Sequence, residues 1–383
     1  MINKKLKVGN VPNLRFPEFT EEWETKKLGE VATNVMYGMN AAATNYDGEN
    51  QYIRITDIDE QTRLFCPNPL SSPDGELDNK YLLHKGDILF ARTGASVGKS
   101  YLYNDKDGKI YFAGFLIRLN VRAEDPYFIF SQTLTEKYQR WVLTMSMRSG
   151  QPGINAEEYK LLPIVIPSIQ EQEKISSFLS LIDSRIQTQN KIIEELKLLK
   201  ITLRYQLYEQ ILNHENEYVQ VKDTLNYEQP TKYLVTNTDY SSDISLIPVL
   251  TANKAFVLGY TDEEFGIYDK GQCIIFDDFT MDIKFVNFPF KVKSSAIKIL
   301  TAKPNVNLKF IFEYLSFLNL SSNEHKRHYI SEIETMEMQL PNYIQQTYVA
   351  DFLASIDDKI KTEFEIHTLL LKQKQYLLAN LFI

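Results

Sequence analysis

The chain has 383 residues, 44% of them hydrophobic and 12% aromatic, and a formal net charge of −8 at pH 7. This length suits two domains better than one, and the apolar content allows each of them to bury a core. The negative net charge argues against a protein that coats nucleic acid regardless of sequence. No uninterrupted apolar run approaches the ~18 residues of a membrane-spanning helix.

Cysteine usage and the N-terminal residues bear on the cellular compartment. Cys66 and Cys273 are the only cysteines, and they lack the paired spacing of a zinc site. The basic residues 1–7 are not followed by an apolar stretch, so no secretory signal is predicted. We therefore expect a reducing, cytoplasmic setting.

Residues 1–166 are predicted to form a first globular block. Short apolar runs with strand character alternate with polar turns, and a stretch of helical periodicity follows them. This order is typical of an α+β domain built on a strongly twisted sheet. The expected elements are a Lys-Gly turn and strand at 85–90, a polar stretch at 91–94, a strand at 115–119, a helix at 126–140, a polar loop at 147–155 and a strand at 161–166.

Residues 167–215 are predicted to form one long helix. Ser168 and Glu171 fit a capping box at its start, directly after Pro167. Apolar residues then recur at steps of three and four, which is the period of a coiled-coil seam. The first of them are Ile175, Leu179, Ile182 and Ile186.

The second block, residues 216–340, echoes the first more weakly. Its expected elements are a Lys-Gly turn and strand at 268–276, a polar stretch at 277–280, a strand at 296–300, a helix at 307–318, a polar loop at 324–330 and a strand at 338–340. This block is the more acidic one, and Asp277 and Asp278 stand where the first block has Arg92. A carboxylate accepts a hydrogen bond from cytosine N4 but repels phosphate. The bases that this block reads are therefore left open.

Residues 341–383 repeat the first long helix without gaps. Pro341 corresponds to Pro167, and each later position in the first helix is matched by the one numbered 174 higher. Such a repeat predicts that the two helices pair and give a pseudo-twofold molecule, because polar breaks at equivalent seam positions fix register and partner. The alternative is two amphipathic helices buried in separate cores. The matched polar breaks are Gln189 with Glu363 and Lys200 with Lys374.

Several segments together resemble one known family. They are residues 162–175, with a second copy after Leu340, and residues 11–19, 52–58 and 86–94. With the order block, helix, block, helix, they are similar to the specificity subunits of type I restriction–modification systems. The resemblance covers almost the whole chain.

The resemblance implies a role for each part. The two blocks would be target-recognition domains, each reading one half of a split sequence in the major groove of double-stranded DNA. The two long helices would pair antiparallel as a coiled coil, set the distance between the half-sites and dock two methyltransferase subunits that modify adenine. A restriction and translocation subunit joins such complexes. The specificity subunit itself carries no catalysis and is expected to hold no cofactor or metal.

Candidate DNA contacts are polar residues at the strand ends and in the closing loops. Arginine pairs with guanine, and glutamine or asparagine with adenine, through two hydrogen bonds each. The candidates in the first block are Arg92, Thr93, Lys99, Arg148, Ser149, Gln151 and Asn155. The candidates in the second block are Thr280, Lys284, Lys326, Arg327 and His328.

Three motifs suggest other chemistry, and their context argues against each. Residues 93–100 resemble a phosphate-binding loop, but Thr93 stands in place of its first glycine and a strand-like stretch follows. Residues 287–290 resemble the Asn-Pro-Pro-aromatic motif of amino-methyltransferases, with phenylalanine as the second residue. His325 and His328 have no third zinc ligand near them in sequence. The alternative function from another class is a scaffold that pairs two protein partners and binds no DNA.

Overall fold

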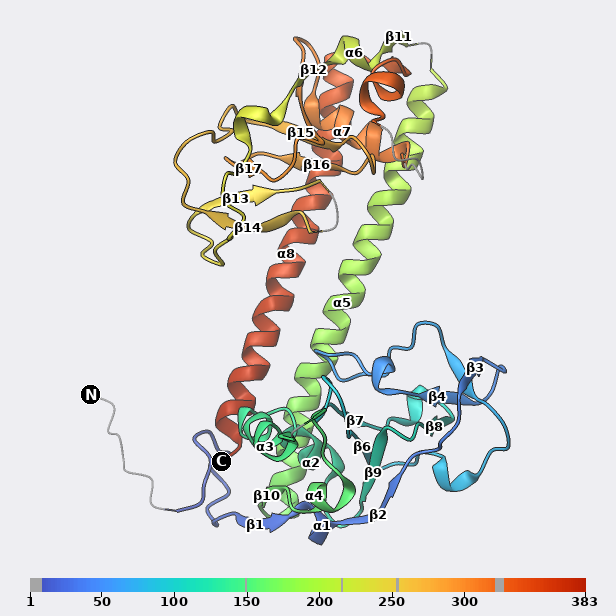
Figure 1. Ribbon diagram of the computed structural model, residues 1–383, viewed down its shortest axis with the longest axis vertical. Coiled ribbons are helices and arrows are strands. Elements are labelled where there is room, and N and C mark those ends of the chain that lie inside the picture. Colours follow the sequence, from blue (N-terminus) through green and yellow to red (C-terminus); the bar gives the residue numbers. More distant parts are fainter. Residues whose placement is uncertain (1–8, 149, 215, 253–254, 321–326) are drawn as a thin grey trace, which may run out of the picture. The chain divides into compact units, whose positions relative to one another are not determined.

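The computed structural model describes residues 9–383 except 149, 215, 253–254 and 321–326. The chain divides into two compact units, Met1–Gln189 with Ile366–Ile383 and Asn190–Glu365, here called the first and second units (Figure 1). Each unit contains one globular block and a part of both long helices. These helices are α5 (Ile169–Leu212) and α8 (Tyr343–Leu381).

A four-stranded antiparallel sheet lies at the centre of the first unit. Its strand order is β2-β9-β6-β7. Ile88 and Phe90 of β6 belong to the core that the helices share, whereas Leu89 belongs to a second core on the other face. The central strand is therefore buried on both faces. The strands are β2 (Ala32–Tyr37), β9 (Leu116–Val121), β6 (Asp87–Ala91) and β7 (Ser100–Leu102).

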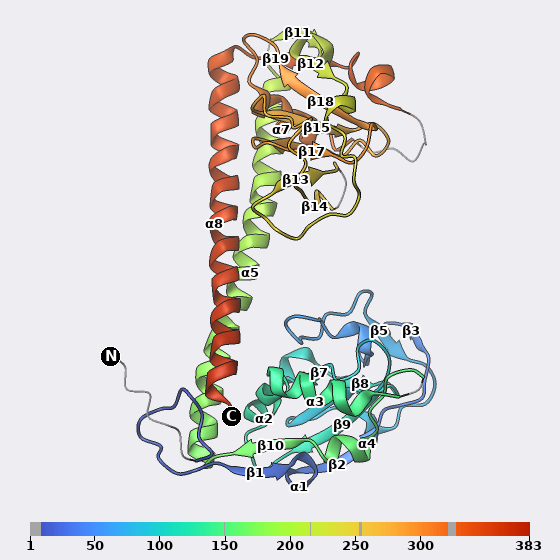
Figure 2. The same cartoon turned by 60° about the vertical axis from the view of Figure 1, so that its left-hand side comes forward.

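Smaller elements complete the first unit. The strand before the long helix pairs with the first strand of the unit, and Figure 2 shows the two side by side as β1 and β10. The paired strands are β1 (Glu24–Lys27) with β10 (Pro163–Ile166), β3 (Ala43–Asn45) with β5 (Ser71–Pro73), and β4 (Gln51–Ile53) with β8 (Ile110–Phe112). The helices are α1 (Leu28–Val31), α2 (Pro126–Gln132), α3 (Glu136–Ser146) and α4 (Ala156–Lys160).

The prediction of a single helix at 126–140 is wrong. The structure has two helices there, α2 and α3, with residues 133–135 between them. Thr135 caps the second helix, because its side chain accepts a hydrogen bond from the backbone N–H of Tyr138. A threonine whose hydroxyl caps a helix favours the start of a new helix over the continuation of the preceding one.

The sheet of the second unit has the same strand order as the first. Its strands run β12-β18-β15-β16, and β11 pairs with β19 as β1 does with β10. The central strands are β12 (Leu225–Glu228), β18 (Ile297–Ala302), β15 (Cys273–Asp277) and β16 (Ile283–Val286). The other elements are β11 (Glu217–Gln220), α6 (Val221–Thr224), β13 (Ile247–Leu250), β14 (Val257–Thr261), β17 (Lys291–Val292), α7 (Leu308–Phe317) and β19 (Glu337–Leu340). The α+β class predicted for both blocks is confirmed.

The long helices pair antiparallel in each unit. In the first unit, Leu179 near the start of α5 shares one core with Leu377 near the end of α8. In the second unit, Tyr208 near the end of α5 shares a core with Leu353 near the start of α8. The helices therefore bury their apolar faces together, and the alternative of separate cores is wrong.

Equivalent ion pairs join the two helices in both units. Lys374 Nζ lies 2.7 Å from Asp183 Oδ1 in the first unit, and Lys200 Nζ lies 2.7 Å from Asp357 Oδ1 in the second. Lys374 and Asp357 are the repeat equivalents of Lys200 and Asp183. The same pair is thus made twice with the helices exchanged, which is the pseudo-twofold relation that the sequence predicted.

The start of α5 differs from a full capping box. Ser168 Oγ accepts from the backbone N–H of Glu171 at 3.4 Å, as predicted. The Glu171 carboxylate, however, accepts two hydrogen bonds from Arg15, from Nε at 2.8 Å and from Nη2 at 2.7 Å. Arg15 lies far away in sequence, so the sequence pattern alone could not reveal this partner.

A buried glutamine ties α5 to the block helix α2. The side-chain oxygen of Gln172 accepts from the backbone N–H of Asp125 at 3.0 Å, and its Nε2 donates to the carbonyl of Pro167 at 3.0 Å. Asp125 is the N-cap of α2. The glutamine therefore connects the start of the long helix to the start of the block helix.

The second unit repeats this arrangement with Gln346. Its side-chain oxygen accepts from the backbone N–H of Asn307 at 2.9 Å, and its Nε2 donates to the carbonyl of Pro341 at 2.8 Å. Asn307 is the N-cap of α7. Because the glutamine and both of its bonds recur, the seating of a block helix at the start of a long helix is part of the repeat.

Among the residues that the structure describes, no helix combines the length and apolar character that crossing a membrane requires.

We expect Gln346→Ala to destabilise the second unit. The substitution leaves the backbone N–H of Asn307 and the carbonyl of Pro341 without their partner. The expected cost is about 1–3 kcal/mol in the free energy of unfolding. Urea unfolding measures the change. Gln345→Ala removes an exposed glutamine from the next position and serves as the control; an equal loss in both variants would contradict the prediction.

Candidate nucleic-acid interface

A hollow of about 860 Å³ opens on the first unit at the end of β6. The sequence candidates Arg92, Thr93 and Gln151 line it, together with Arg54 and the aromatic residues Tyr37 and Phe115. The two aromatic side chains are 40% and 60% exposed. The structure thus gathers three of the predicted residues beside two exposed aromatic rings.

Arg92 is held in place from several sides. Its guanidinium carbon lies 5.0 Å from the centre of the Tyr37 ring and 5.8 Å from that of Phe115. Its backbone N–H donates to the carbonyl of Phe115, and its own carbonyl accepts from Ile154. Cation–π contacts orient a guanidinium without using its hydrogen-bond donors. The terminal nitrogens of Arg92 can therefore be offered to a ligand in the hollow.

The closing loop of the block is brought to Arg92 by backbone pairing. Thr93 forms an antiparallel bridge with Gly153, and the N–H of Gly94 donates to the carbonyl of Pro152 at 3.1 Å. Gly94 has φ of +77°, a conformation that glycine adopts at little cost. Gln151, which precedes this pairing, is exposed at the rim.

Sequence reasoning missed Arg54 and the two exposed aromatic residues of the hollow, Tyr37 and Phe115. Arg54 is bound by Asp57 through two hydrogen bonds of 2.8 Å, and this hydrogen bonding raises the pKa of its guanidinium. A signal for Tyr37 was available in the glycine that follows it. A Cβ on Gly38 would lie 2.2 Å from the carbonyl oxygen of Ala113, so only glycine permits this close approach.

Lys99 does not lie at the hollow. Its side chain is 7% exposed, and its ammonium lies 2.5 Å from Glu60 Oε2 and donates to the carbonyl of Ile58. This geometry favours a role in holding the loop that contains Ile58 and Glu60. The next residues form strand β7 instead of a helix, which is the context that the sequence predicted and which does not suit a phosphate-binding loop.

The other candidates of the closing loop serve local structure. Arg148 Nη2 lies 2.5 Å from Glu158 Oε1. Asn155 is the N-cap of α4, and its side chain accepts from the backbone N–H of Glu158. Neither residue lines the hollow. Ser149 lies outside the described residues.

In the second unit, Asp277 and Asp278 hold the turn after β15. Asp277 Oδ1 accepts from the backbone N–H groups of Phe279 and Thr280 at 2.9 and 3.0 Å. Asp278 is buried; its Oδ1 accepts from the N–H of Tyr329 at 2.9 Å, and its Oδ2 lies 3.2 Å from Lys298 Nζ. The idea that these carboxylates accept from cytosine is therefore not favoured, because both already have partners.

The remaining second-block candidates are divided between surface and core. Thr280 is exposed in the turn, and Lys284 lies half-buried in β16 opposite Ile275. Arg327 is exposed, with its Nε 3.9 Å from Asp278 Oδ2. The predicted DNA contact of His328 is not favoured, because its side chain is buried. It is 1% exposed, with Nδ1 3.0 Å from Glu332 Oε2. Lys326 and His325 lie outside the described residues.

Part of the chain matches a known domain family. Residues 20–198, which include the whole lining of the hollow, match the family model of the type I restriction modification DNA specificity domain. This part of the chain is therefore similar to the type I specificity domain. The recognition made from the sequence segments is thereby confirmed.

Two curated relatives have names that describe type I specificity subunits. A stretch covering 33% of the chain is 44% identical to the specificity subunit of the type I restriction enzyme EcoR124I/EcoR124II of Escherichia coli, and it spans only 33% of that protein. The putative type I restriction enzyme MjaX specificity subunit of Methanocaldococcus jannaschii is 23% identical, with 94% of this chain and 90% of that protein covered.

Two solved structures have the same fold. The S subunit of a type I restriction–modification system from M. genitalium superposes with a TM-score of 0.62 at 15% identity, covering 97% of this chain and 99% of that one. A chain from a study of complex assembly and conformational transition of the type I system superposes with a TM-score of 0.55 at 14% identity, covering 94% and 97%.

We expect Asp278→Ala to lower the free energy of unfolding of the second unit. The substitution leaves Lys298, which is 1% exposed, as a buried charge without its counter-ion, at a cost of about 3–5 kcal/mol. Chemical unfolding measures the loss. The control is Asp282→Ala, which removes an exposed carboxylate from the same turn; a loss of similar size in the control would contradict the prediction.

Proposed function

We propose that this chain is the specificity subunit of a type I restriction–modification enzyme and reads a split DNA target, one half with each unit. The family match and the fold of its neighbours support this role. The observation that carries the proposal is the hollow of the first unit. There Arg92, Thr93 and Gln151 meet beside exposed aromatic rings.

Base reading follows from the chemistry of these side chains. The ends of the Arg92 guanidinium form a planar pair of donors that fits guanine O6 and N7. Gln151 offers one donor and one acceptor, the pair that adenine presents at N7 and N6. Thr93 can contact a base edge or a phosphate. Arg92 and Gln151 are thus the proposed readers of the first half-site.

The acidic net charge is compatible with DNA binding by a complex. Phosphate contacts give most of the affinity, and base-edge contacts give the sequence preference. A chain of net charge −8 can supply the second kind if bound partners supply the first. Two methyltransferase subunits that clamp the duplex would do so.

The proposed division of labour follows the block and helix order. Residues 1–166 and 216–340 are the target-recognition domains, and residues 167–215 and 341–383 are the spacers on which methyltransferase subunits dock. Half-sites read from one face of DNA lie about one helical turn apart, or roughly 34 Å. Catalysis belongs to the partner subunits, which methylate adenine and, where a restriction subunit joins, cleave DNA in the cytoplasm.

Methylation sequencing tests the proposal. DNA is taken from cells that express this chain with the methyltransferase encoded beside it, and from cells that lack this chain. We expect a split motif methylated on adenine in both halves that disappears without this chain. A stable complex that methylates nothing would favour the alternative, a scaffold that pairs two protein partners.

Arg92→Ala should alter the first half-site alone. Loss of a bidentate base contact costs about 1–3 kcal/mol and relaxes the preference at one position. The measurement is the methylated motif of the variant. The second half-site should be unchanged, because Arg92 belongs to the first unit.

Two further arginines separate this assignment from a general effect of charge. Arg140→Ala removes an exposed arginine of α3 and should leave the motif unchanged. Arg148→Ala tests the closing loop, whose arginine is bound to Glu158. A motif that relaxes with Arg148→Ala but not with Arg92→Ala would move the reading site from the hollow to the loop.

A further inference from the structure

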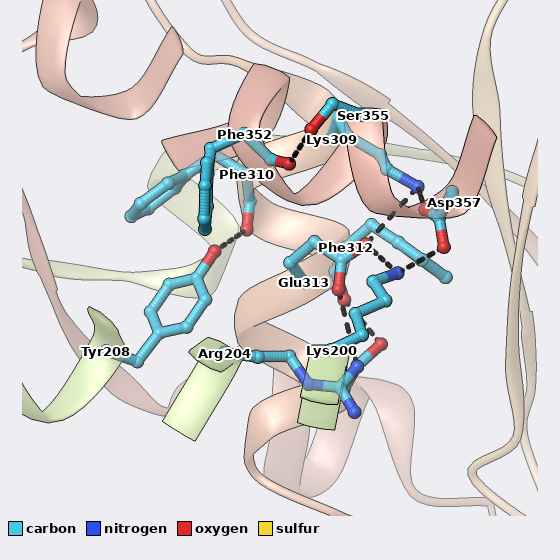
Figure 3. A network of polar contacts seen from close by, with 11 residues as sticks. Lys200, Arg204, Tyr208, Lys309, Phe310, Phe312, Glu313, Phe352, Ser355 and Asp357 are labelled. Carbon is cyan, nitrogen blue, oxygen red and sulfur yellow. Dashed lines mark hydrogen bonds and ion pairs between the residues drawn. The ribbon is translucent and has the colours of Figure 1, made fainter. Parts of the chain in front are cut away.

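The second unit contains a cluster of charges where α5, α7 and α8 meet (Figure 3). We call it the second joint. It consists of Lys200 and Arg204 of α5, Lys309 and Glu313 of α7, and Asp357 of α8. The helix α7 belongs to the globular block, whereas the other two are the long helices. The joint is therefore the place where the block is fastened to the helix pair.

Glu313 is the centre of the second joint. It is 0% exposed, and three cations surround its carboxylate. Its Oε1 lies 2.8 Å from Lys200 Nζ and 3.2 Å from Lys309 Nζ, and its Oε2 lies 3.3 Å from Arg204 Nη1. A buried carboxylate is tolerated only with such partners. Two of these cations, Lys200 and Arg204, come from α5. The block is thus seated where this long helix supplies positive charge.

Asp357 completes the charge balance from the other long helix. It lies 2.7 Å from Lys200 Nζ and 2.9 Å from Lys309 Nζ. Burial opposes ionisation of Asp357, but the hydrogen bonds from Lys200 and Lys309 outweigh it and lower the pKa of the carboxyl group. Asp357 is therefore ionised at neutral pH, and the second joint joins three cations to two anions.

The first unit has an equivalent joint built from different residues. Asp183, Lys374 and Leu378 are the repeat equivalents of Asp357, Lys200 and Arg204. On α2, Tyr127 and Ser131 follow the N-cap Asp125 by the same steps as Lys309 and Glu313 follow Asn307 on α7. This set of five residues is the first joint.

The first joint contains one ion pair, two hydroxyl side chains and one apolar residue. Tyr127 donates a hydrogen bond to Asp183, and Lys374 Nζ lies 2.7 Å from the same carboxylate. Ser131 Oγ donates to the carbonyl of Tyr127, within its own helix. Leu378 is buried in the apolar core. The pair Ser131 and Leu378 thus occupies the places of the ion pair between Glu313 and Arg204.

We propose that the second joint is a charge-matched seat, in which Glu313 and Arg204 position the second recognition block on the helix pair and thereby fix the spacing of the two half-sites. A block that carries the buried Glu313 is seated most stably when Arg204 completes the three cations around it, whereas the block with serine at the equivalent position is seated beside leucine. The effect on half-site spacing rests on the proposed function, whereas the seating of the block rests on the contacts of Glu313 alone.

A cycle of substitutions in the full-length chain tests the seat. Glu313→Ser and Arg204→Leu each install the residue of the first joint, and the double variant installs both. Glu313→Ser leaves Arg204 without its carboxylate, whereas Arg204→Leu takes one of the three cations from the buried Glu313. The melting temperature should therefore fall by roughly 5–15 °C in Glu313→Ser and by less in Arg204→Leu. The double variant removes both charges together and should regain most of the loss.

Two outcomes of this cycle would overturn the seat. One is a double variant whose loss equals the sum of the single losses, because the residues would then act independently. The other is a loss of the same size for Glu264→Ser, which removes an exposed carboxylate of the same unit. If Glu313→Ser does not accumulate, Glu313→Gln, which removes the charge at nearly constant shape, replaces it in the cycle.

The methylated motif gives a readout that a purely structural role would not move. With the methyltransferase present, the single variants should keep the bases of both half-sites but accept more than one number of base pairs between them, and the double variant should restore one spacing. A single spacing in destabilised variants would overturn the positioning role. Absence of any motif with the unaltered chain would instead count against the proposed function, while the melting cycle would still decide the seat.

Discussion

The pairing of α5 with α8 is the constraint on which the rest of the molecule depends. In each unit the apolar faces of the two helices close one core, and a lysine of one helix meets an aspartate of the other. Apolar burial provides most of the stabilisation, and the polar pair selects the register, since a shift by one turn would separate these partly buried charges. Both globular blocks are then fastened to this pair by the same two devices, a buried glutamine and a joint at the block helix.

The two devices have been kept to different degrees. Gln172 and Gln346 make the same bonds to the N-cap of a block helix and to the proline before a long helix. The joints occupy equivalent positions but differ in chemistry, because all five residues of the second are charged whereas the first has a single ion pair. The glutamine bonds to backbone groups, so it fits any block whose helix begins at this position. The joint consists of side chains, so it discriminates between blocks. The helix pair can therefore carry two blocks that differ in sequence. The joints favour each block at its own position on the pair.

The recognition surfaces show where that divergence is greatest. At the end of β6, Arg92 lies between exposed aromatic rings, whereas at the equivalent end of β15 two carboxylates stabilise a turn and a buried lysine. The same strand order thus supports a basic hollow in one unit and an internally neutralised turn in the other. Such a difference is compatible with two units that read different half-sites. It also agrees with the proposal that phosphate contacts come mainly from partner subunits.

The sequence by itself determined the elements whose information is periodic or repeated. The long helices, their pairing, the equivalence of Lys200 with Lys374 and the α+β character of the blocks follow from local spacing, because apolar periodicity and helix starts are encoded within a few residues. Only the tertiary structure decided which polar residues are free to bind. Lys99, Asn155 and His328 are of the right type, yet each already has a partner, namely a distant carbonyl, the first turn of a helix and a neighbouring carboxylate. Arg54 and Phe115 join the hollow through contacts between segments far apart in the chain. Exposure and partnership are set by long-range packing, and no local pattern carries that information.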